Sequence, residues 1–262
     1  MAEQLEGQTS IFDFIDNPRS NGIRKREHMQ ILIACEESQE VCKAFRAKGH
    51  EAYSCDVQEC SGGHPEWHIT GDVLPLLNGR CELETMDGKT HTITGRWDMI
   101  IAFPPCTHLA VSGAKFFEQK RKDGRQEEGV RFFCQFLVAD CDRIAVENPV
   151  NIISGAYVSK YFPKLCEEYG LPRKPECTVQ PYEHGEHARK KTCLWLKGLT
   201  PIKPTHVVDC GELGPNGHSV GAGFYKLRDE NGKAIPYHDP RTAKIRSKTF
   251  PGIARAMAEQ WG

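Results

Sequence analysis

Asp98-Met-Ile-Ile-Ala-Phe103-Pro104-Pro105-Cys106-Thr107-His108 is the stretch that decides the fold, because it joins an unbroken apolar run to two prolines and a cysteine. The run Met99 to Phe103 is short and apolar, which is typical of a strand buried on both faces of a sheet. The two prolines prevent any continuation as a ladder or a helix. We therefore expect Cys106 at the carboxyl end of a strand, where open α/β sheets hold their ligands.

Two other segments favour a functional reading of Cys106 over a structural one. A lone cysteine in a loop is more often a small buried hydrophobe, and this chain has twelve cysteines. A second predicted strand, however, runs from Arg143 to Pro149 and ends in Glu147-Asn148. A third segment, His187 to Lys191, is basic and precedes the apolar run 192–196. Three polar groups are thus expected to meet where neighbouring strands end, with Cys106 as a nucleophile.

The order of these motifs resembles that of the DNA cytosine-5 methyltransferases, in particular compact members of bacteriophage type. The signatures of that family are Pro-Cys, Glu-Asn-Val and Gln-x-Arg-x-Arg, and Pro149 stands here where the family has valine. The segment Ser247 to Ala258 also looks like the family's final Gly-Asn-Ser-Val-Pro element and the helix after it. The resemblance covers roughly residues 30–198 and 241–262. It implies an α/β fold: a Rossmann-like S-adenosylmethionine-dependent methyltransferase sheet with a small, loop-rich recognition segment.

The resemblance implies methylation of cytosine carbon 5 in DNA through a covalent Cys106 adduct. Glu147 would contact ring nitrogen 3 and the amino group, Arg189 would donate to oxygen 2, and Asn148 would support the turn. The catalytic residues implied are Cys106, Glu147, Arg189, Asn148 and Pro105. A duplex substrate would have to flip its cytosine out of the stack.

The cofactor S-adenosylmethionine is expected at the turn after a first strand, Met29 to Ala34. The residues implied to bind it are Ala34, Cys35, Glu36, Glu37, Ser38, Asp56, Asp72, Val73, Phe103 and Pro104. The family's turn is rich in glycine, whereas this turn carries two glutamates. A glutamate carboxylate could hold the cofactor's ammonium group, or the bulkier side chains could block the pocket. Asp56 suits ribose hydroxyls, and Asp72 suits either adenine or the cap of a turn.

DNA is the expected partner, although the net charge is only −1. The residues expected to contact nucleic acid are Ser112, Lys115, Lys120, Arg121, Lys122 and Lys191. A further basic cluster comprises Arg241, Lys244, Arg246 and Lys248, and each cluster could equally be a solvated face. The stretch 114–128 is expected to be a mobile loop that closes over DNA and leads into a helix from Gly129 to Val138.

The 262 residues divide into four expected parts. These are a flexible tail 1–28, a catalytic domain 29–198, a recognition segment 199–240 and a helix 241–262 that returns to the catalytic domain. In the tail, Gln8, Ile11 and Phe12 match the pattern of peptides that dock in bacterial sliding clamps, although folding back onto the domain is at least as plausible. A β-hairpin is expected over 81–94, and strands over 51–55, 178–182 and 192–196.

No apolar run is long enough to span a membrane, and the amino terminus lacks the order of a signal peptide. We therefore expect a cytoplasmic protein, in a bacterial host cytoplasm if a phage encodes it, with its cysteines reduced. The spacing of Cys55, Cys60, His64 and His68 matches no common zinc site, and no metal is expected.

Three alternatives to DNA methylation stay open. RNA or a free nucleotide could be the substrate, since the recognition segment is short. A modified sulfonium cofactor could deliver another group, as the unusual Glu36 and Glu37 suggest. A non-catalytic DNA-binding protein on a methyltransferase fold is the third. Protection of DNA in a restriction-modification system would be one biological role.

Overall fold

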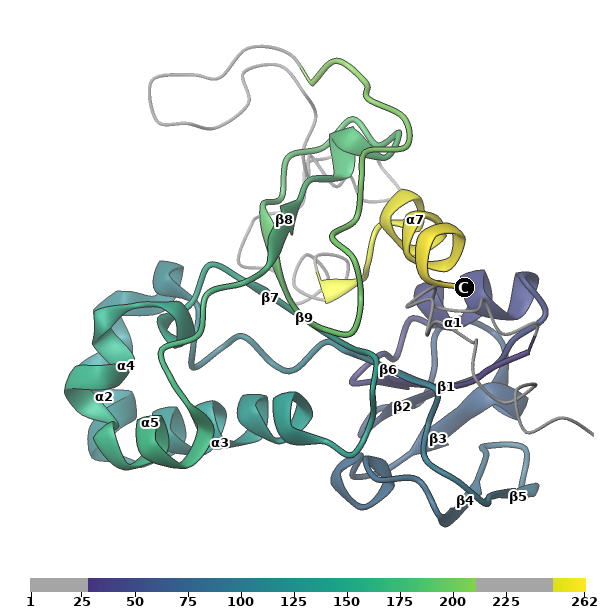
Figure 1. Ribbon diagram of the computed structural model, residues 1–262, viewed down its shortest axis with the longest axis horizontal. Helices are drawn as coiled ribbons and strands as arrows, with labels where there is room; N and C mark the ends of the chain where they lie inside the picture. Colours follow the sequence, from purple (N-terminus) through teal and green to yellow (C-terminus); the bar gives the residue numbers. More distant parts are fainter. Residues whose placement is uncertain (1–27, 211–246) are drawn as a thin grey trace, which may run out of the picture.

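The central feature of the computed structural model is a seven-stranded sheet with the strand order β3-β2-β1-β6-β7-β9-β8 (Figure 1). The structure describes residues 28–210 and 247–262. The strands are β1 (Gln30–Ala34), β2 (Glu51–Asp56), β3 (His68–Thr70), β6 (Met99–Ala102), β7 (Ile144–Pro149), β8 (Cys177–Val179) and β9 (Thr192–Lys197). All neighbours from β3 to β7 pair in parallel, whereas β9 runs antiparallel to both β7 and β8. A mostly parallel sheet with helices fits a Rossmann-like α/β fold.

The expected central strands are confirmed, because each is a short apolar run. Every residue of β6 is buried, as are four of the five residues of β1. Such strands are covered on both faces. On one face α1 (Glu40–Ala47) packs with α7 (Pro251–Trp261) over the odd-numbered residues of β1, Ile31 and Ile33.

On the other face Leu32 and Ala34 of β1 belong to a second core with α3 (Arg125–Val138) and α5 (Pro163–Tyr169). Figure 1 shows these helices on the opposite side of the sheet from α1 and α7. The hairpin predicted outside the main sheet is confirmed as β4 (Cys81–Glu84) and β5 (Thr90–Ile93), which form an antiparallel pair of their own.

The prediction of a loop over 114–128 is wrong. A 3-10 stretch, Val111–Phe116, leads directly into α2 (Phe117–Lys122), and α3 already begins at Arg125. The charged pattern hid this helix because only Phe117 and Lys120 of α2 are buried. Gly124, with a φ of 85°, breaks the two helices apart rather than opening a loop. Strand β3 and the helices α4 (Ala156–Tyr161) and α5 were not predicted.

Several predictions fall outside the described residues. They concern the clamp-like tail peptide with Gln8, Ile11 and Phe12, the part of the recognition segment after residue 210, and the cations Arg241, Lys244 and Arg246. Each of the twelve cysteines is a free thiol. Within residues 28–210 and 247–262, no helix is both long and apolar enough to cross a bilayer. The same residues form no cluster of three or more side chains suited to a metal ion.

Candidate active site

The strand directions bring the sequence-predicted residues to one edge of the sheet. Strands β1, β2, β6 and β7 are parallel, so the turns that follow them leave the same edge. Strand β9 is antiparallel, and its first residue, Thr192, pairs with Pro149 at the end of β7. The basic segment before Thr192 therefore reaches this edge too. After β1 the chain continues to β2 on one side of the sheet, and after β6 it continues to β7 on the other side. The crevice between the carboxyl ends of β1 and β6 is therefore the usual position of a ligand in open α/β sheets.

The turn that carries Cys106 is fixed to both neighbouring strands. The Phe103 amide donates to the Ala34 carbonyl at 2.9 Å, which extends the β1–β6 pairing by one residue. On the other side, Nδ2 of Asn148 donates to the Pro104 carbonyl at 2.8 Å, and the Asn148 side chain is fully buried. Asn148 is thus a positioning residue for the Pro104–Cys106 turn, as expected.

The chain beyond Cys106 turns back at once and leaves this residue at the surface. The Cys106 carbonyl accepts from the amides of Leu109 and Ala110 at 3.0 and 2.9 Å. Pro105 is exposed, whereas Cys106 is half-buried. A thiol in this position is accessible to a ligand in the crevice while its backbone stays fixed.

Glu147 lies one residue before Asn148 on β7 and is half-buried. Burial raises the pKa of its carboxyl group, while the Lys190 ammonium and a hydrogen bond from the Thr192 side chain act in the opposite direction. Thr192 faces Pro149 across the β7–β9 pair, so it lies diagonally from Glu147 on the same face. A buried carboxyl of this kind holds a proton more readily than an exposed one.

The cation next to Glu147 is Lys190, which sequence reasoning missed. The signal was present, since residues 190, 192 and 194 share one face of an extended strand. Arg189 points elsewhere, with its guanidinium carbon 5.1 Å from the centre of the Tyr182 ring. Lys191 is exposed.

Glu36, expected to bind the cofactor, instead caps α1. Its Oε1 accepts from the Val41 amide at 2.6 Å, and its Oε2 accepts from the Cys42 amide at 3.2 Å. These amides are otherwise unpaired at a helix start, where negative charge is also favourable. The Glu36 carboxylate is therefore not available to a cofactor's ammonium group, and this part of the expectation is corrected.

We expect the burial of the Glu36 carboxyl group to make stability fall as pH rises. Burial raises the pKa of Glu36 to about 8 despite the two amide hydrogen bonds. The unfolded chain loses this proton near the ordinary glutamate pKa of about 4.3. Between these two values the folded state binds more protons, so the free energy of unfolding falls by up to roughly 1.4 kcal/mol per pH unit. Thermal unfolding of Glu36→Gln should show a flatter pH profile than wild type, whereas the exposed control Glu59→Gln should keep the wild-type slope. An unchanged slope in Glu36→Gln would contradict this assignment.

Glu37 is the carboxylate that remains available in the turn. Its side chain is only 8 % exposed, and neither carboxylate oxygen has a hydrogen-bond partner among the described residues. Its backbone is held, since the Glu37 carbonyl accepts from the Ser61 amide at 2.9 Å. Gly62 packs against this turn, and a Cβ atom added to Gly62 would lie only 2.6 Å from the Ser38 carbonyl oxygen. A buried carboxylate without a partner costs free energy unless a ligand compensates it.

Two aspartates complete the cofactor position. The charges of Asp56 and Asp72 both raise the pKa of the Cys35 thiol, after burial as the largest cause. The ends of β1, β2 and β3 therefore gather these acids around Cys35, whose φ of 58° makes the sharp turn. Asp72 also accepts from the Leu74 amide at 3.0 Å, so the alternative role as a cap holds as well. The neighbouring residues Ala34, Ser38 and Val73, which were also expected to bind the cofactor, are buried.

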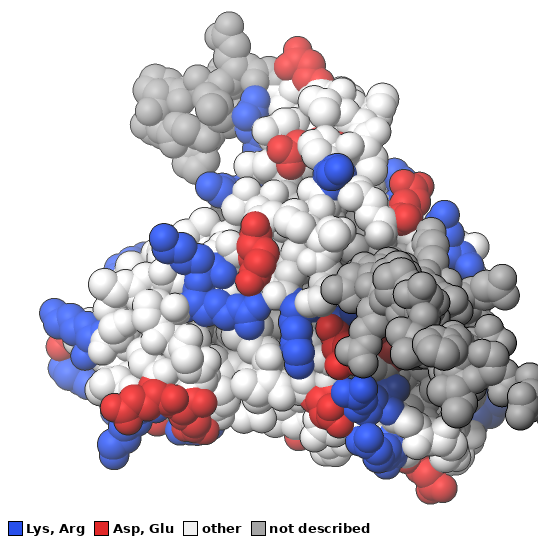
Figure 2. Space-filling model, in the orientation of Figure 1, with Lys and Arg blue, Asp and Glu red and all other residues white. Residues whose placement is uncertain are grey.

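The expected nucleic-acid contacts fall into two groups. Lys120 is buried, and its ammonium donates to the Thr107 carbonyl, so it fixes the turn after Cys106 instead of meeting solvent. Lys122 is exposed and pairs with Glu118 at 2.8 Å. Ser112 and Lys115 are exposed on the 3-10 stretch. Figure 2 shows Lys and Arg side chains gathered in the middle of one face, beside β7 and β9.

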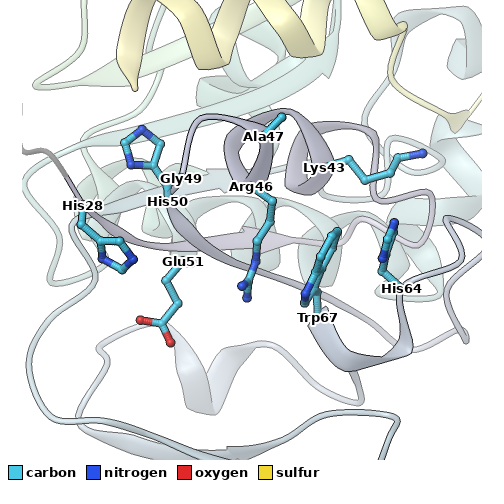
Figure 3. Close-up of a pocket in the computed structure, with 9 residues that line it drawn as sticks. All are labelled: His28, Lys43, Arg46, Ala47, Gly49, His50, Glu51, His64 and Trp67. Atoms are coloured by element: carbon cyan, nitrogen blue, oxygen red, sulfur yellow. The ribbon is translucent and has the colours of Figure 1, made fainter.

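A separate hollow of about 760 Å³ lies away from this edge (Figure 3). Its lining residues are His28, Lys43, Arg46, Ala47, Gly49, His50, Glu51, His64 and Trp67. Arg46 extends between Glu51 and Trp67, with its guanidinium carbon 5.1 Å from the Trp67 ring. Nε of Arg46 donates to the Ala52 carbonyl at 2.8 Å. Ala52 lies on the part of β2 that does not pair with β3, since that pairing begins at Ser54. The hollow lies at the amino ends of β1 and β2, opposite the end that carries Cys106.

No family model matches the chain, and no curated protein matches it either. The fold and the site thus define this chain directly as an α/β protein with a mostly parallel seven-stranded sheet. At one edge of that sheet lie a cysteine on a proline turn, a half-buried glutamate and a group of acids around a strand-to-helix turn.

Proposed function

We propose that the chain is an S-adenosylmethionine-dependent methyltransferase that modifies carbon 5 of cytosine in DNA. The observation that carries the proposal is the joint placement of Cys106 and Glu147. The turn of Cys106 follows β6, Glu147 lies near the end of the adjacent β7, and the Asn148–Pro104 hydrogen bond of 2.8 Å ties the two together. The motif resemblance and a sheet compatible with a Rossmann-like methyltransferase support the same assignment.

The residues around the end of β1 fit the proposed cofactor. Glu37 would hold the ammonium group of its amino-acid part, because this buried carboxylate has no partner among the described residues. Asp56 at the end of β2 would hold the ribose hydroxyls, and Asp72 would lie beside the adenine. When bound, S-adenosylmethionine supplies the electrophilic methyl group.

The protein's own residues would make cytosine reactive towards that methyl group. The Cys106 thiolate adds to carbon 6, forming a carbon–sulfur bond and pushing electron density towards carbon 5. Glu147, in its protonated form, donates to nitrogen 3 and so stabilises the negative charge that arrives there. The resemblance assigns oxygen 2 to Arg189, whose guanidinium group would have to turn from the Tyr182 ring into the crevice to donate there. After carbon 5 has received the methyl group, its proton passes to water, the carbon–sulfur bond breaks and the electron pair returns to Cys106.

Transfer of a labelled methyl group tests this reaction. Wild-type protein is incubated with labelled S-adenosylmethionine and, in parallel, with duplex DNA, single-stranded DNA, RNA and dCMP. We expect label on cytosine in DNA, at carbon 5 after hydrolysis to nucleosides. Label on RNA or on dCMP instead of DNA would mean that the substrate is not DNA. No label on any substrate, with folded protein and DNA of varied sequence, would refute the proposed reaction.

A binding measurement tests the assignment of Glu37. In the variant Glu37→Gln we expect S-adenosylmethionine to bind roughly 10- to 100-fold more weakly by calorimetry, the range for losing a hydrogen bond to a charged group. 5′-Methylthioadenosine, which lacks the amino-acid part, should bind wild type and variant equally. Equal losses for both compounds would show a general distortion of the pocket, and no loss for either would remove Glu37 from the site.

A further inference from the structure

A surface beside Cys106 exposes aromatic rings together with cations. Phe116 is 48 % exposed and Tyr161 is 38 % exposed. The ammonium nitrogen of Lys115 lies 4.8 Å from the centre of the Phe116 ring. The guanidinium carbon of Arg121 and the ammonium nitrogen of Lys160 lie 4.0 and 4.9 Å from the centre of the Tyr161 ring. We call these five residues the α2–α4 surface, because they lie on or next to helices α2 and α4 (Figure 1).

The Phe116 side of this surface is joined to the turn of Cys106. The Lys120 ammonium lies 5.9 Å from the centre of the Phe116 ring and donates to the carbonyl of Thr107. Phe116 is therefore held near the residue that follows Cys106.

The Tyr161 side is joined to the same turn through Tyr157 and Gln126. The rings of Tyr157 and Tyr161 are 4.7 Å apart. The Tyr157 hydroxyl donates to Oε1 of Gln126 at 2.9 Å, and Nε2 of Gln126 donates to the His108 carbonyl at 3.1 Å. Both ends of the α2–α4 surface thus have a fixed relation to Cys106.

Exposed apolar side chains are concentrated in the same region. Val111 is 47 % exposed, Val150 is 41 % exposed, and the Val111 amide donates to the Val150 carbonyl at 3.0 Å. With Phe116 and Tyr161 they make up four of the nine exposed large apolar residues in the part of the chain that the structure describes. Grouped exposed apolar side chains beside a site indicate a binding surface, whereas scattered single ones need no explanation.

We propose that the α2–α4 surface binds an unpaired strand of nucleic acid that flanks the target cytosine. The inference deepens the proposed function, since it names the class of substrate that reaches Cys106. A base can stack on each exposed ring when the cation that lies over that ring turns towards the phosphate attached to the base. The shared chemistry fits a single strand of DNA or of RNA.

An unpaired strand fits the rings better than a duplex. In a duplex the faces of the bases are covered by neighbouring base pairs, so Phe116 and Tyr161 would find only sugars and phosphates. In a single strand every base has a face to offer, and stacking on aromatic side chains is tolerant of sequence. An unpaired cytosine also reaches Cys106 without the cost of leaving a base stack.

Fluorescence anisotropy of the full chain with labelled oligonucleotides tests the proposal without requiring methyl transfer. The probes are single-stranded DNA, RNA of the same sequence and the corresponding DNA duplex, each over a series of salt concentrations. We expect wild type to bind a single strand at least about tenfold more tightly than the duplex. Phe116→Leu and Tyr161→Leu, which keep an apolar side chain but remove the ring, should each weaken single-strand binding by about tenfold. Val138→Ala, an exposed apolar change at the far end of α3, is the matched control, and thermal unfolding checks that each variant is folded.

The outcomes separate this surface from the proposed reaction. Duplex binding as tight as single-strand binding, or unchanged single-strand affinity in both folded ring variants, would overturn the inference. If single strands bind through the rings but no substrate accepts label, the surface stands and the proposed reaction fails. If duplex DNA is methylated and the ring variants bind like wild type, the reaction stands and the surface fails. Tighter binding of RNA than of DNA would support the α2–α4 surface as a single-strand binding surface, with RNA as its ligand.

Discussion

Cys106→Ala is expected to abolish methyl transfer, lowering the rate by at least about 10³-fold, as removal of a covalent nucleophile does. Without the thiolate, no bond forms to carbon 6, and carbon 5 stays too poor in electrons to accept a methyl group. Cofactor affinity should stay near the wild-type value, because the cofactor residues lie mainly at the ends of β1 and β2. The measurement is single-turnover transfer of labelled methyl to DNA, together with calorimetry of S-adenosylmethionine binding.

A second variant separates nucleophile loss from damage to the turn. Cys106→Ser keeps the size of the side chain but replaces the thiol by a hydroxyl, which is far less ionised at neutral pH. It should be as inactive as the alanine variant. Cys60→Ser, at a partly exposed cysteine on another loop, should retain activity. Turnover in either Cys106 variant comparable to wild type would remove this residue from the reaction.

Glu147→Gln is expected to lower the rate by roughly 10²-fold or more, the range for a positioned acid or base. The glutamine amide can still donate to nitrogen 3, but it cannot transfer a proton or respond to the charge that develops there. Burial raises the pKa of Glu147, so its protonated form, which the proposed reaction uses, is favoured in the folded protein.

The pH dependence gives the sharper test of Glu147. The protonated form is fully present below the raised pKa and is lost as pH rises through it, so activity should decline on the alkaline side. Ionisation of Cys106 has the opposite effect, and the two together predict a bell-shaped profile of kcat/KM. In Glu147→Gln the alkaline decline should disappear while the acidic limb remains. If the variant keeps the wild-type profile at full rate, Glu147 has no part in the chemistry.

The central strands were predictable because their signal is local. Runs such as 99–103 and 144–146 are apolar and contain β-branched residues, and prolines or polar residues follow them. Strand β3, in contrast, has only three residues and begins with a histidine, so it exists because Ser54, Cys55 and Asp56 of β2 offer a parallel edge to pair with. Helix α2 was missed for a related reason, since only Phe117 and Lys120 of its six residues are buried and the packing of these two marks it as a helix.

The candidate site divides in the same way. The sequence by itself determined that Cys106 follows one buried strand and that Glu147 lies near the end of another, since this depends on neighbouring residues along the chain. Only the tertiary structure decided which carboxylate of the pair Glu36 and Glu37 is free for a ligand, because the helix amides that bind Glu36 exist only once α1 has formed. The antiparallel pairing of β9 likewise decided that Lys190 is the cation next to Glu147. Contacts between strands depend on direction and register, which no short motif encodes.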